Sequence, residues 1–279
     1  MAIGKSISFF LIDGSVDGVI ACELYNWTGK AYKVPRSLLK TVADRDELWK
    51  AGVYFLLGHD DSDRPTAYIG EAEEAYKRLT QHQDREFWSE AIVFISKDEN
   101  LNKAHIKYLE YTLHREALDV GRYRLSNGNT PNKPAISEAD RAVMMEFSEN
   151  LRLIIGTLGY KLFEPLTKRR SAKQTYRIEA ARGAKAQGIE TAEGFVVLKG
   201  SRIASSDVPS IPVAIQKKRE LLLETQEVVD WTLVADVLFS SPSTAAAVVM
   251  GRSANGLVEW VLEDGTTLKD NQAIDAPRT

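Results

Sequence analysis

The chain has 279 residues, more than a typical single domain of about 100 to 200 residues, so two domains are expected. Apolar residues make up 44% and charged residues 27%, an ordinary globular composition that excludes a wholly disordered or fibrous protein. The net charge of -3 excludes a protein coated in positive charge, but the charge is uneven along the chain. Residues 1–165 and 221–279 are acidic overall, whereas residues 166–220 are strongly basic.

The composition also bears on location. The longest apolar runs fall far short of the roughly 20 residues that a membrane span needs. The N-terminus lacks the basic start, apolar core and cleavage site of a signal peptide. Cys22 is the single cysteine, so no internal disulfide can form, and the four histidines are too scattered for a zinc-ligand cluster. These features predict a soluble, cytoplasmic protein without a membrane partner.

The first 51 residues are expected to form an N-terminal extension. Two segments rich in β-branched and aromatic residues, 6–12 and 18–24, flank a turn at residues 13–15 and predict a β-hairpin. Pro35 stands at a favoured helix entry position, and apolar residues follow at roughly helical spacing, so a helix is expected from there to Lys50.

Residues 52–165 are expected to form a small α/β unit. Alternating apolar segments and polar turns predict strands at 53–57, 66–69 and 91–95 and helices at 71–83 and 101–120. The fold class is therefore α+β, with a three-stranded antiparallel sheet flanked by helices. Gly121 is expected to stop the second helix, and Ser137 to begin a further helix that packs back on this unit.

The rest of the chain divides into a linker and a smaller domain. The charged residues 166–190 suggest a basic linker, and residues 191–279 a smaller α+β accessory domain. In that domain a helix is expected over 213–225, and Ser243 is expected to cap a short helix through Met250. A pair of strands is expected over 256–267.

Two triplets on the first two strands of the α/β unit carry the functional signal. They are Gly52-Val53-Tyr54 and Tyr68-Ile69-Gly70. Eight residues after the second triplet comes Arg78, and His82 follows four residues later. Together with Glu110 in the later helix, this order and spacing resembles the motif of the GIY-YIG nucleases. The one departure within the triplets is Val53 in place of isoleucine, an apolar β-branched exchange that leaves a strand intact.

The resemblance implies a metal-dependent endonuclease that hydrolyses DNA with a single Mg²⁺ or Mn²⁺ ion. Glu110 would hold the metal, and Tyr54 would act as general base if neighbouring cations lower its pKa or if it relays a proton onward. Arg78 would contact phosphate oxygens, His82 would orient water or protonate the leaving group, and Tyr68 would position phosphate or water. An asparagine, either Asn127 or Asn129, would stabilise the site by hydrogen bonding.

The residue types and their spacing also support these roles independently of the resemblance, although they define the roles less specifically. Arg78 and His82 lie four apart and would project from one face of a helix. Glu110 falls inside an apolar helical stripe, where a carboxylate needs a partner such as a cation. Taken singly, each residue also has a purely structural interpretation: a strand aromatic, a solvated helix face, a turn, or a pairing of Glu110 with Lys107 or His114. The alternative is therefore a binding module that keeps the fold without constitutive cleavage.

DNA is the expected partner. The residues expected to contact it are all basic: Lys77, Lys168, Arg169, Arg170 and Lys173. A solvated linker remains the alternative for the last four. A homodimer would allow both strands to be cut, but no dimerisation pattern is visible.

The C-terminal region also resembles a known sequence family. Residues 194–201, 239–246 and 251–260 are similar to a domain of unknown function that is often fused to prokaryotic GIY-YIG nucleases. The resemblance implies a prokaryotic protein and an accessory role in binding a target or a protein partner. Ser243 is expected to be a helix cap and not a nucleophile, because no histidine follows His114 to activate it.

Overall fold

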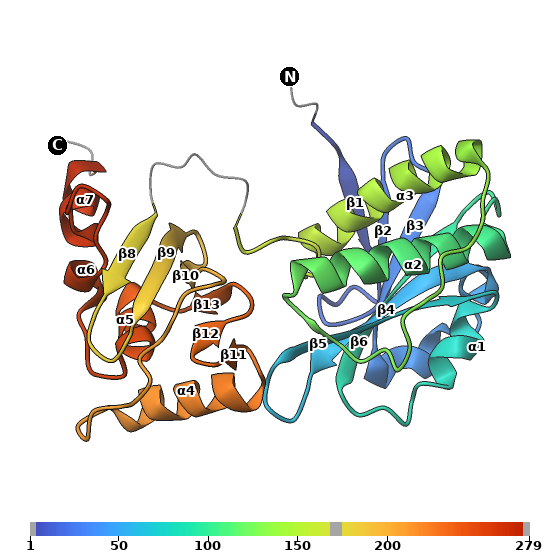
Figure 1. The fold of residues 1–279 in the computed structure, drawn as a ribbon. Coiled ribbons are helices and arrows are strands. Elements are labelled where there is room, and N and C mark those ends of the chain that lie inside the picture. The colour runs from blue at the N-terminus through green and yellow to red at the C-terminus, as the bar shows by residue number, and fades with distance from the viewer. Residues whose placement is uncertain (1–3, 168–174, 276–279) are drawn as a thin grey trace. The chain divides into compact units, whose positions relative to one another are not determined.

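The computed structural model describes residues 4–167 and 175–275, and the chain divides into two compact units, Met1–Pro165 and Leu166–Thr279. Each unit combines helices with sheet around its own hydrophobic core (Figure 1). The α+β class expected from the sequence is therefore confirmed. Within the described residues, no helix has both the length and the apolar character needed to cross a membrane.

The first unit is built on a seven-stranded sheet. Its strands are β1 (Ile7–Leu11), β2 (Ile20–Leu24), β3 (Gly29–Pro35), β4 (Gly52–His59), β5 (Pro65–Ala72), β6 (Trp88–Ser96) and β7 (Arg124–Leu125). They lie in the order β1-β2-β3-β6-β4-β5-β7, and all neighbours are antiparallel except the short parallel pair β5 and β7.

This sheet is larger than the three-stranded sheet that the sequence predicts. The three expected strands are β4, β5 and β6, which lie side by side within it. Strand β3 was not expected, because Lys30 and Lys33 interrupt its apolar residues. Since β3 pairs with both β2 and β6, residues 1–51 are part of the same sheet and not a separate extension.

The helices of the first unit also differ in part from expectation. They are two 3₁₀ helices, η1 (Arg36–Val42) and η2 (Asp46–Trp49), and three α-helices, α1 (Ala75–Thr80), α2 (Lys103–Val120) and α3 (Glu138–Thr157). The single helix expected up to Lys50 is wrong. The buried Leu39 and Val42 lie three residues apart, a spacing that places both on one face of a 3₁₀ helix.

Helix α1 is shorter than predicted because β5 continues through Glu71 and Ala72, which pair with β4. The other helix boundaries follow their sequence signals. Gly121 ends α2 in the left-handed conformation with φ 67°. The Ser137 hydroxyl caps α3 by accepting a hydrogen bond from the Asp140 amide.

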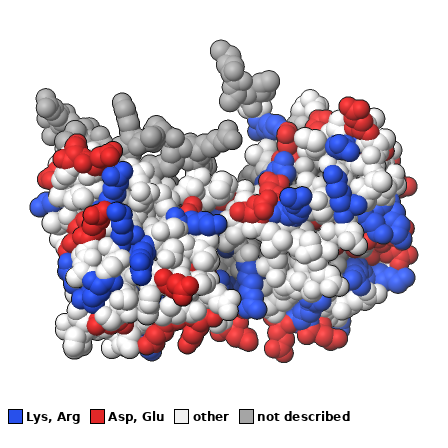
Figure 2. Space-filling view, in the orientation of Figure 1, with Lys and Arg blue, Asp and Glu red and all other residues white. Residues whose placement is uncertain are grey.

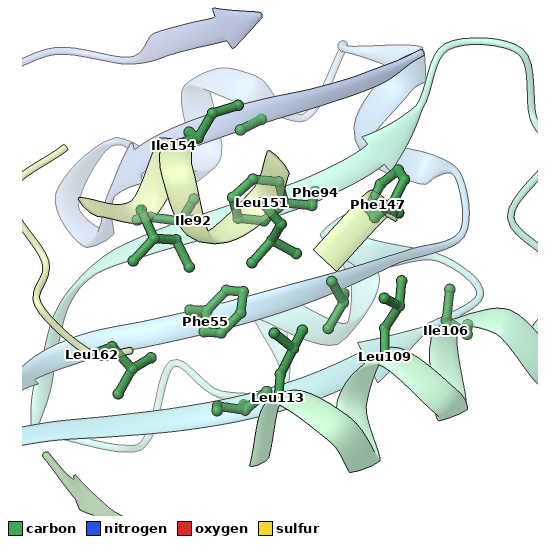
Figure 3. Close-up of a cluster of buried hydrophobic side chains, with 14 of the residues drawn as sticks. Phe55, Ile92, Phe94, Ile106, Leu109, Leu113, Phe147, Leu151, Ile154 and Leu162 are labelled. Carbon is green, nitrogen blue, oxygen red and sulfur yellow. The ribbon is translucent and has the colours of Figure 1, made fainter. Parts of the chain in front are cut away.

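Both faces of the large sheet are covered. On one face Phe55, Ile92 and Phe94 pack against α2 and α3, with Leu162 beside them (Figure 3). The opposite face buries a second apolar cluster that includes Tyr54, Leu39 of η1 and Leu79 of α1. Successive residues of a strand point to opposite faces, so Tyr54 lies on the side of α1 while its neighbours point toward α2.

The second unit has a four-stranded antiparallel sheet in the order β13-β10-β9-β8. Its strands are β8 (Tyr176–Glu179), β9 (Lys185–Thr191), β10 (Gly194–Val197) and β13 (Val237–Phe239), with a separate pair β11 (Val228–Val229) and β12 (Thr232–Leu233). Its helices are α4 (Val213–Glu224), α5 (Pro242–Met250), α6 (Gly256–Glu259) and α7 (Leu268–Asp275). Helix α5 contacts β9, β10 and β13, and Trp260 packs on Phe195 in the core at 4.6 Å between ring centroids.

Three sequence predictions for this unit need correction. Strand β8 and most of β9 lie within the expected basic linker, because their charged residues alternate with buried ones such as Ile178 and Ala186. The cap of α5 is Ser241, whose hydroxyl accepts from the Thr244 amide, and not Ser243. The expected strand pair over 256–267 is instead α6 followed by a single bridge between Val261 and Thr267.

Candidate functional site

The two triplets meet across adjacent strands, and their glycines permit the contact. Tyr54 of β4 lies directly opposite Gly70 of β5. A Cβ atom at Gly70 would collide with the Tyr54 hydroxyl and with the ring of Tyr68, so only glycine leaves room for both tyrosines. A Cβ atom at Gly52 would likewise collide with the Phe94 carbonyl oxygen on β6. Steric crowding therefore explains why a glycine stands at each end of the motif.

Tyr54 and His82 form a buried pair on this face of the sheet. Tyr54 Oη lies 2.8 Å from His82 Nε2, and both side chains are almost completely shielded from solvent. His82 lies just beyond the end of α1 and not within it, and its carbonyl accepts a hydrogen bond of 2.9 Å from Trp88 Nε1. Burial, with the charges of Arg78 and Arg85, lowers the His82 pKa to about 4. The imidazole is therefore neutral near pH 7 and can accept a proton.

Arg78 connects the two tyrosines. Its guanidinium interacts with both Tyr54 and Tyr68 and donates a 2.7 Å hydrogen bond to Gln81 Oε1. Because Arg78 is also exposed, the same group is accessible to a ligand. Burial and the neighbouring Tyr68 raise the pKa of Tyr54, and the Arg78 charge only partly opposes this rise. The direction is opposite to the lowered pKa that a tyrosinate base requires.

Strand β7 covers only the first part of the outer edge of β5, and other groups pair with the rest. Only Thr66 and Ala67 pair with β7, and the Ser126 amide donates to the Ala67 carbonyl at 2.9 Å. At Ile69 the partner is the Asn127 side chain, which accepts from the Ile69 amide at 3.2 Å and donates to the Ile69 carbonyl at 2.7 Å. The Asn127 amide group thus takes the place of a β-ladder partner.

Glu110 occupies the next position along the same edge. The amide of Glu71 hydrogen-bonds to the Glu110 carboxylate, so Glu110 lies two residues farther along β5 than Asn127. Two residues of a strand span roughly 6.7 Å, which places the Asn127 and Glu110 side chains close together. The structure therefore brings Asn127 to the site, whereas Asn129 is exposed and forms no part of this edge.

The Glu110 carboxylate is half-buried and poorly compensated. Burial and the nearby Glu71 charge raise its pKa from 4.5 to about 7, while Arg78 and Lys107 oppose the rise. The structure shows no pairing of Glu110 with His114 among the described residues: burial alone lowers the pKa of His114, and its Nδ1 has no hydrogen-bond partner there. A site that disfavours its own carboxylate charge would gain from a bound cation.

A divalent metal ion fits this donor set. Among residues 4–167 and 175–275, no three His, Cys, Asp or Glu side chains cluster closely enough to form a metal cage. Mg²⁺ does not need one, because it usually takes one or two protein carboxylates and completes its octahedron with water and substrate phosphates. Glu110, with Glu71 beside it, offers that chemistry, and the raised pKa of Glu110 is the observation that favours the fit.

An open depression of about 470 Å³ lies beside these groups. Glu71, Lys77 and Arg78 are among the residues that line it, so the guanidinium and a carboxylate of the site meet solvent there. Lys77 pairs with Glu74 at 2.8 Å, but both side chains are exposed, so the pair is weak and a phosphate could compete for Lys77. The other expected DNA contacts, Lys168, Arg169, Arg170 and Lys173, lie outside the described residues.

Sequence reasoning missed two residues of this site. Glu71 directly follows the second triplet, and its position next to Gly70 was the available signal. Arg85 stacks on Tyr68 with its guanidinium carbon 4.8 Å from the ring centroid. Its position three residues after His82 was a weaker sequence signal than that of Glu71. Cys22 of β2 is not part of this site: it is buried, and burial raises its thiol pKa to about 12.

Comparison with known families assigns only the second unit. Residues 176–272 match the model of a domain of unknown function (DUF4357), and no match to a nuclease family model accompanies it. The matched range begins at β8 and ends within α7, so it covers nearly all of the described helices and strands of that unit. No curated protein and no solved structure matches the chain.

Proposed function

We propose that the first unit is a metal-dependent DNA endonuclease of the GIY-YIG type. The observation that carries the proposal is convergence: residues that the resemblance to the GIY-YIG motif singles out gather around one end of β5. They come from β4, β5, α1, the turn after α1, α2 and the loop after β7, and they are Tyr54, Tyr68, Arg78, His82, Glu110 and Asn127.

In this proposal Glu110 holds the metal ion, with Glu71 as its neighbouring carboxylate. The chemistry that bound Mg²⁺ or Mn²⁺ supplies at such a site is neutralisation of charge on the phosphoryl oxygens. Arg78 binds a second phosphoryl oxygen through its planar fork of donors, and Lys77 adds a positive charge at the mouth of the depression. Asn127 keeps β5 in place and so fixes the distance between the carboxylate and the tyrosines.

Proton transfer runs through Tyr54 and His82. Because burial raises the Tyr54 pKa, the phenol keeps its proton and cannot act as a tyrosinate. It can accept a proton from the attacking water only while passing its own proton to the neutral His82 Nε2, 2.8 Å away. The water oxygen then bonds to phosphorus, the bond to the leaving oxygen breaks, and that oxygen takes a proton from solvent.

A second candidate function is a DNA-binding module that cleaves only conditionally. The observation that favours it is the complete burial of Tyr54, which keeps its hydroxyl away from bulk water. A substrate that enters the depression must then shift the Tyr54 and Tyr68 rings before the relay can work. The two candidates share the fold and differ only in whether phosphodiester bonds break.

Nicking of supercoiled plasmid separates the candidates. Wild type is incubated with Mg²⁺ or Mn²⁺ beside two single variants of α2, Glu110→Gln and Glu116→Gln. Glu116 is a matched control because it is also a half-buried carboxylate on α2, but it pairs with Arg152 at 2.7 Å. Metal-dependent nicking that only Glu110→Gln abolishes supports the nuclease. DNA binding in EDTA without nicking under either metal supports the binding module.

A further inference from the structure

The second unit carries an open depression of about 520 Å³ on one face of its small sheet. Arg177 of β8 and Lys185 of β9 are exposed there, because they alternate along their strands with the buried Ile178 and Ala186. Lys199 and Arg202, both exposed, also line it, from the segment after β10, and Glu179 is its one acidic lining residue. We call these four residues, Arg177, Lys185, Lys199 and Arg202, the basic sheet face.

Strand pairing fixes the basic residues next to one another. Lys185 forms a β-bridge with Arg202, so their Cα atoms belong to adjacent strands about 5 Å apart. One row farther along the sheet, Arg177 lies opposite Gln187, whose carbonyl accepts from the Leu198 amide at 2.8 Å, just before Lys199. Several Lys and Arg side chains gather over β8 and β9 in the view of Figure 2. The positive charge is therefore held on a rigid sheet.

Nearby carboxylates neutralise this charge only in part. Arg177 pairs with Glu263 at 3.4 Å and Lys185 with Glu179 at 2.8 Å, and both acids are well exposed, so these pairs are weak. Within the described part of the chain, Lys199 and Arg202 form no ion pair with an acidic side chain. The nearest acid to Lys199 is Asp236, which accepts from its backbone amide at 2.8 Å.

The remaining lining indicates what this charge can bind. No aromatic side chain lines the depression, so it offers no platform for stacking unpaired bases. Its apolar members, Ile178 and Ala186, point into the core, so no side chain is available to insert into a lipid surface. Cations without stacking or insertion groups are suited to the phosphates of a double helix.

We propose that the basic sheet face binds the phosphate backbone of duplex DNA. This role goes beyond cleavage, because it assigns a ligand to the unit that matches a domain of unknown function. It needs neither Glu110 nor a metal ion. Since phosphate contacts carry no sequence information, the face would supply affinity and leave sequence preference to other groups.

The test uses the full-length chain in EDTA, where cleavage cannot interfere with binding. Fluorescence anisotropy with a labelled duplex of about 20 base pairs gives the affinity between about 50 and 200 mM salt. Lys199→Gln/Arg202→Gln removes two exposed charges from the face. The control, Lys217→Gln/Lys218→Gln, removes two charges from α4 in the same unit; neither residue lines the depression, and Lys218 also lies over the Phe239 ring at 5.2 Å. Thermal unfolding checks that both variants remain folded.

Two lost phosphate contacts lower the slope of log affinity against log salt by about 1.8. Over this fourfold range of salt, wild type should therefore lose about 12-fold more affinity than the face variant, whereas the control should follow wild type. Equal slopes for wild type and the face variant, or an equal loss in the control, would overturn the proposal. So would vesicles rich in phosphatidylserine that bind wild type and not the face variant while duplex binding is unchanged.

Failure of this proposal is distinguishable from failure of the proposed nuclease. If the face does not bind DNA, Glu110-dependent nicking can still occur. If nicking fails under every metal, the salt dependence of duplex binding still reports on Lys199 and Arg202.

Discussion

Replacing Glu110 by glutamine should stabilise the protein above neutral pH in the absence of metal ions. Burial and Glu71 raise the Glu110 pKa from 4.5 to about 7, so ionisation is less favourable in the folded chain than in the unfolded chain. The folded state then binds the extra proton between these two values, and wild type loses stability as pH rises through about 7. Glutamine keeps the shape and a hydrogen-bond acceptor for the Glu71 amide but never ionises.

The magnitude follows from the size of the shift. A pKa change from 4.5 to about 7 corresponds to about 3.4 kcal/mol at 1.36 kcal/mol per unit. Glu110 is only half-buried, so solvent screening reduces this to about 1.5 kcal/mol. We therefore expect Glu110→Gln to exceed wild type by about 1.5 kcal/mol in free energy of unfolding near pH 8 and to match it near pH 4, below the unfolded pKa of 4.5.

Urea unfolding in EDTA at both pH values measures this difference. Adding Mg²⁺ near pH 8 should then stabilise wild type and leave Glu110→Gln unchanged, because binding to the folded state alone raises stability. A variant that is less stable than wild type by the same amount at both pH values would contradict this prediction. That result would mean that the Glu110 carboxylate is well compensated by its neighbours.

Three further outcomes are expected. Gly70→Ala should lower the free energy of unfolding by about 1–3 kcal/mol in urea, because its Cβ would displace Tyr54, whereas Gly128→Ala, with open space around it, should change little. Because the His82 pKa is lowered from 6.5 to about 4, the unfolded chain takes up the proton at a higher pH than the folded chain, so acidification over this range destabilises the fold. In a Glu110→Gln background, the chain with His82 should therefore lose up to about 3.4 kcal/mol more free energy of unfolding between pH 6.5 and about 4 than the chain with His82→Gln. Parallel pH profiles of the two chains would contradict this. Asn127→Ala should cost about 1–2 kcal/mol by leaving Ile69 unpaired, and an equal cost for Asn129→Ala would argue against its edge role.

Much of the candidate site could be predicted because its residues lie on regular elements of known period. The two triplets alternate along paired strands, so Tyr54 and Gly70 meet once the hairpin register is set. Glu110 lies on a long helix with clear start and stop signals, and its half-buried position follows from the apolar stripe around it. The resemblance to the GIY-YIG motif singles out these positions, and the periods of the strands and the helix predict where their side chains lie.

Other features depend on partners that are distant in sequence. Strand β3 exists because β6, which begins more than fifty residues later, supplies its hydrogen bonds. The direction of the Tyr54 pKa shift depends on burial beneath several elements, and spacing contains no information about that. Asn127 resembles an ordinary turn residue until the unpaired edge of β5 is seen beside it.

The second unit shows the same limit. Charged residues of β8 and β9 gave the appearance of a linker because only alternate positions face the core. Small residues such as Ala184 and Ala186 fill those core positions and give a weak apolar signal. Their burial is evident only from the structure, where Trp260 and Phe195 belong to the same core.

The most direct test of the central claim is the rate of plasmid nicking in Mn²⁺ by wild type, Glu110→Gln and Glu116→Gln. We expect wild type to nick the plasmid, Glu110→Gln to lose at least about 100-fold in rate, and Glu116→Gln to stay within about threefold of wild type. Nicking by Glu110→Gln at the wild-type rate would rule out Glu110 as the metal ligand of a nuclease site.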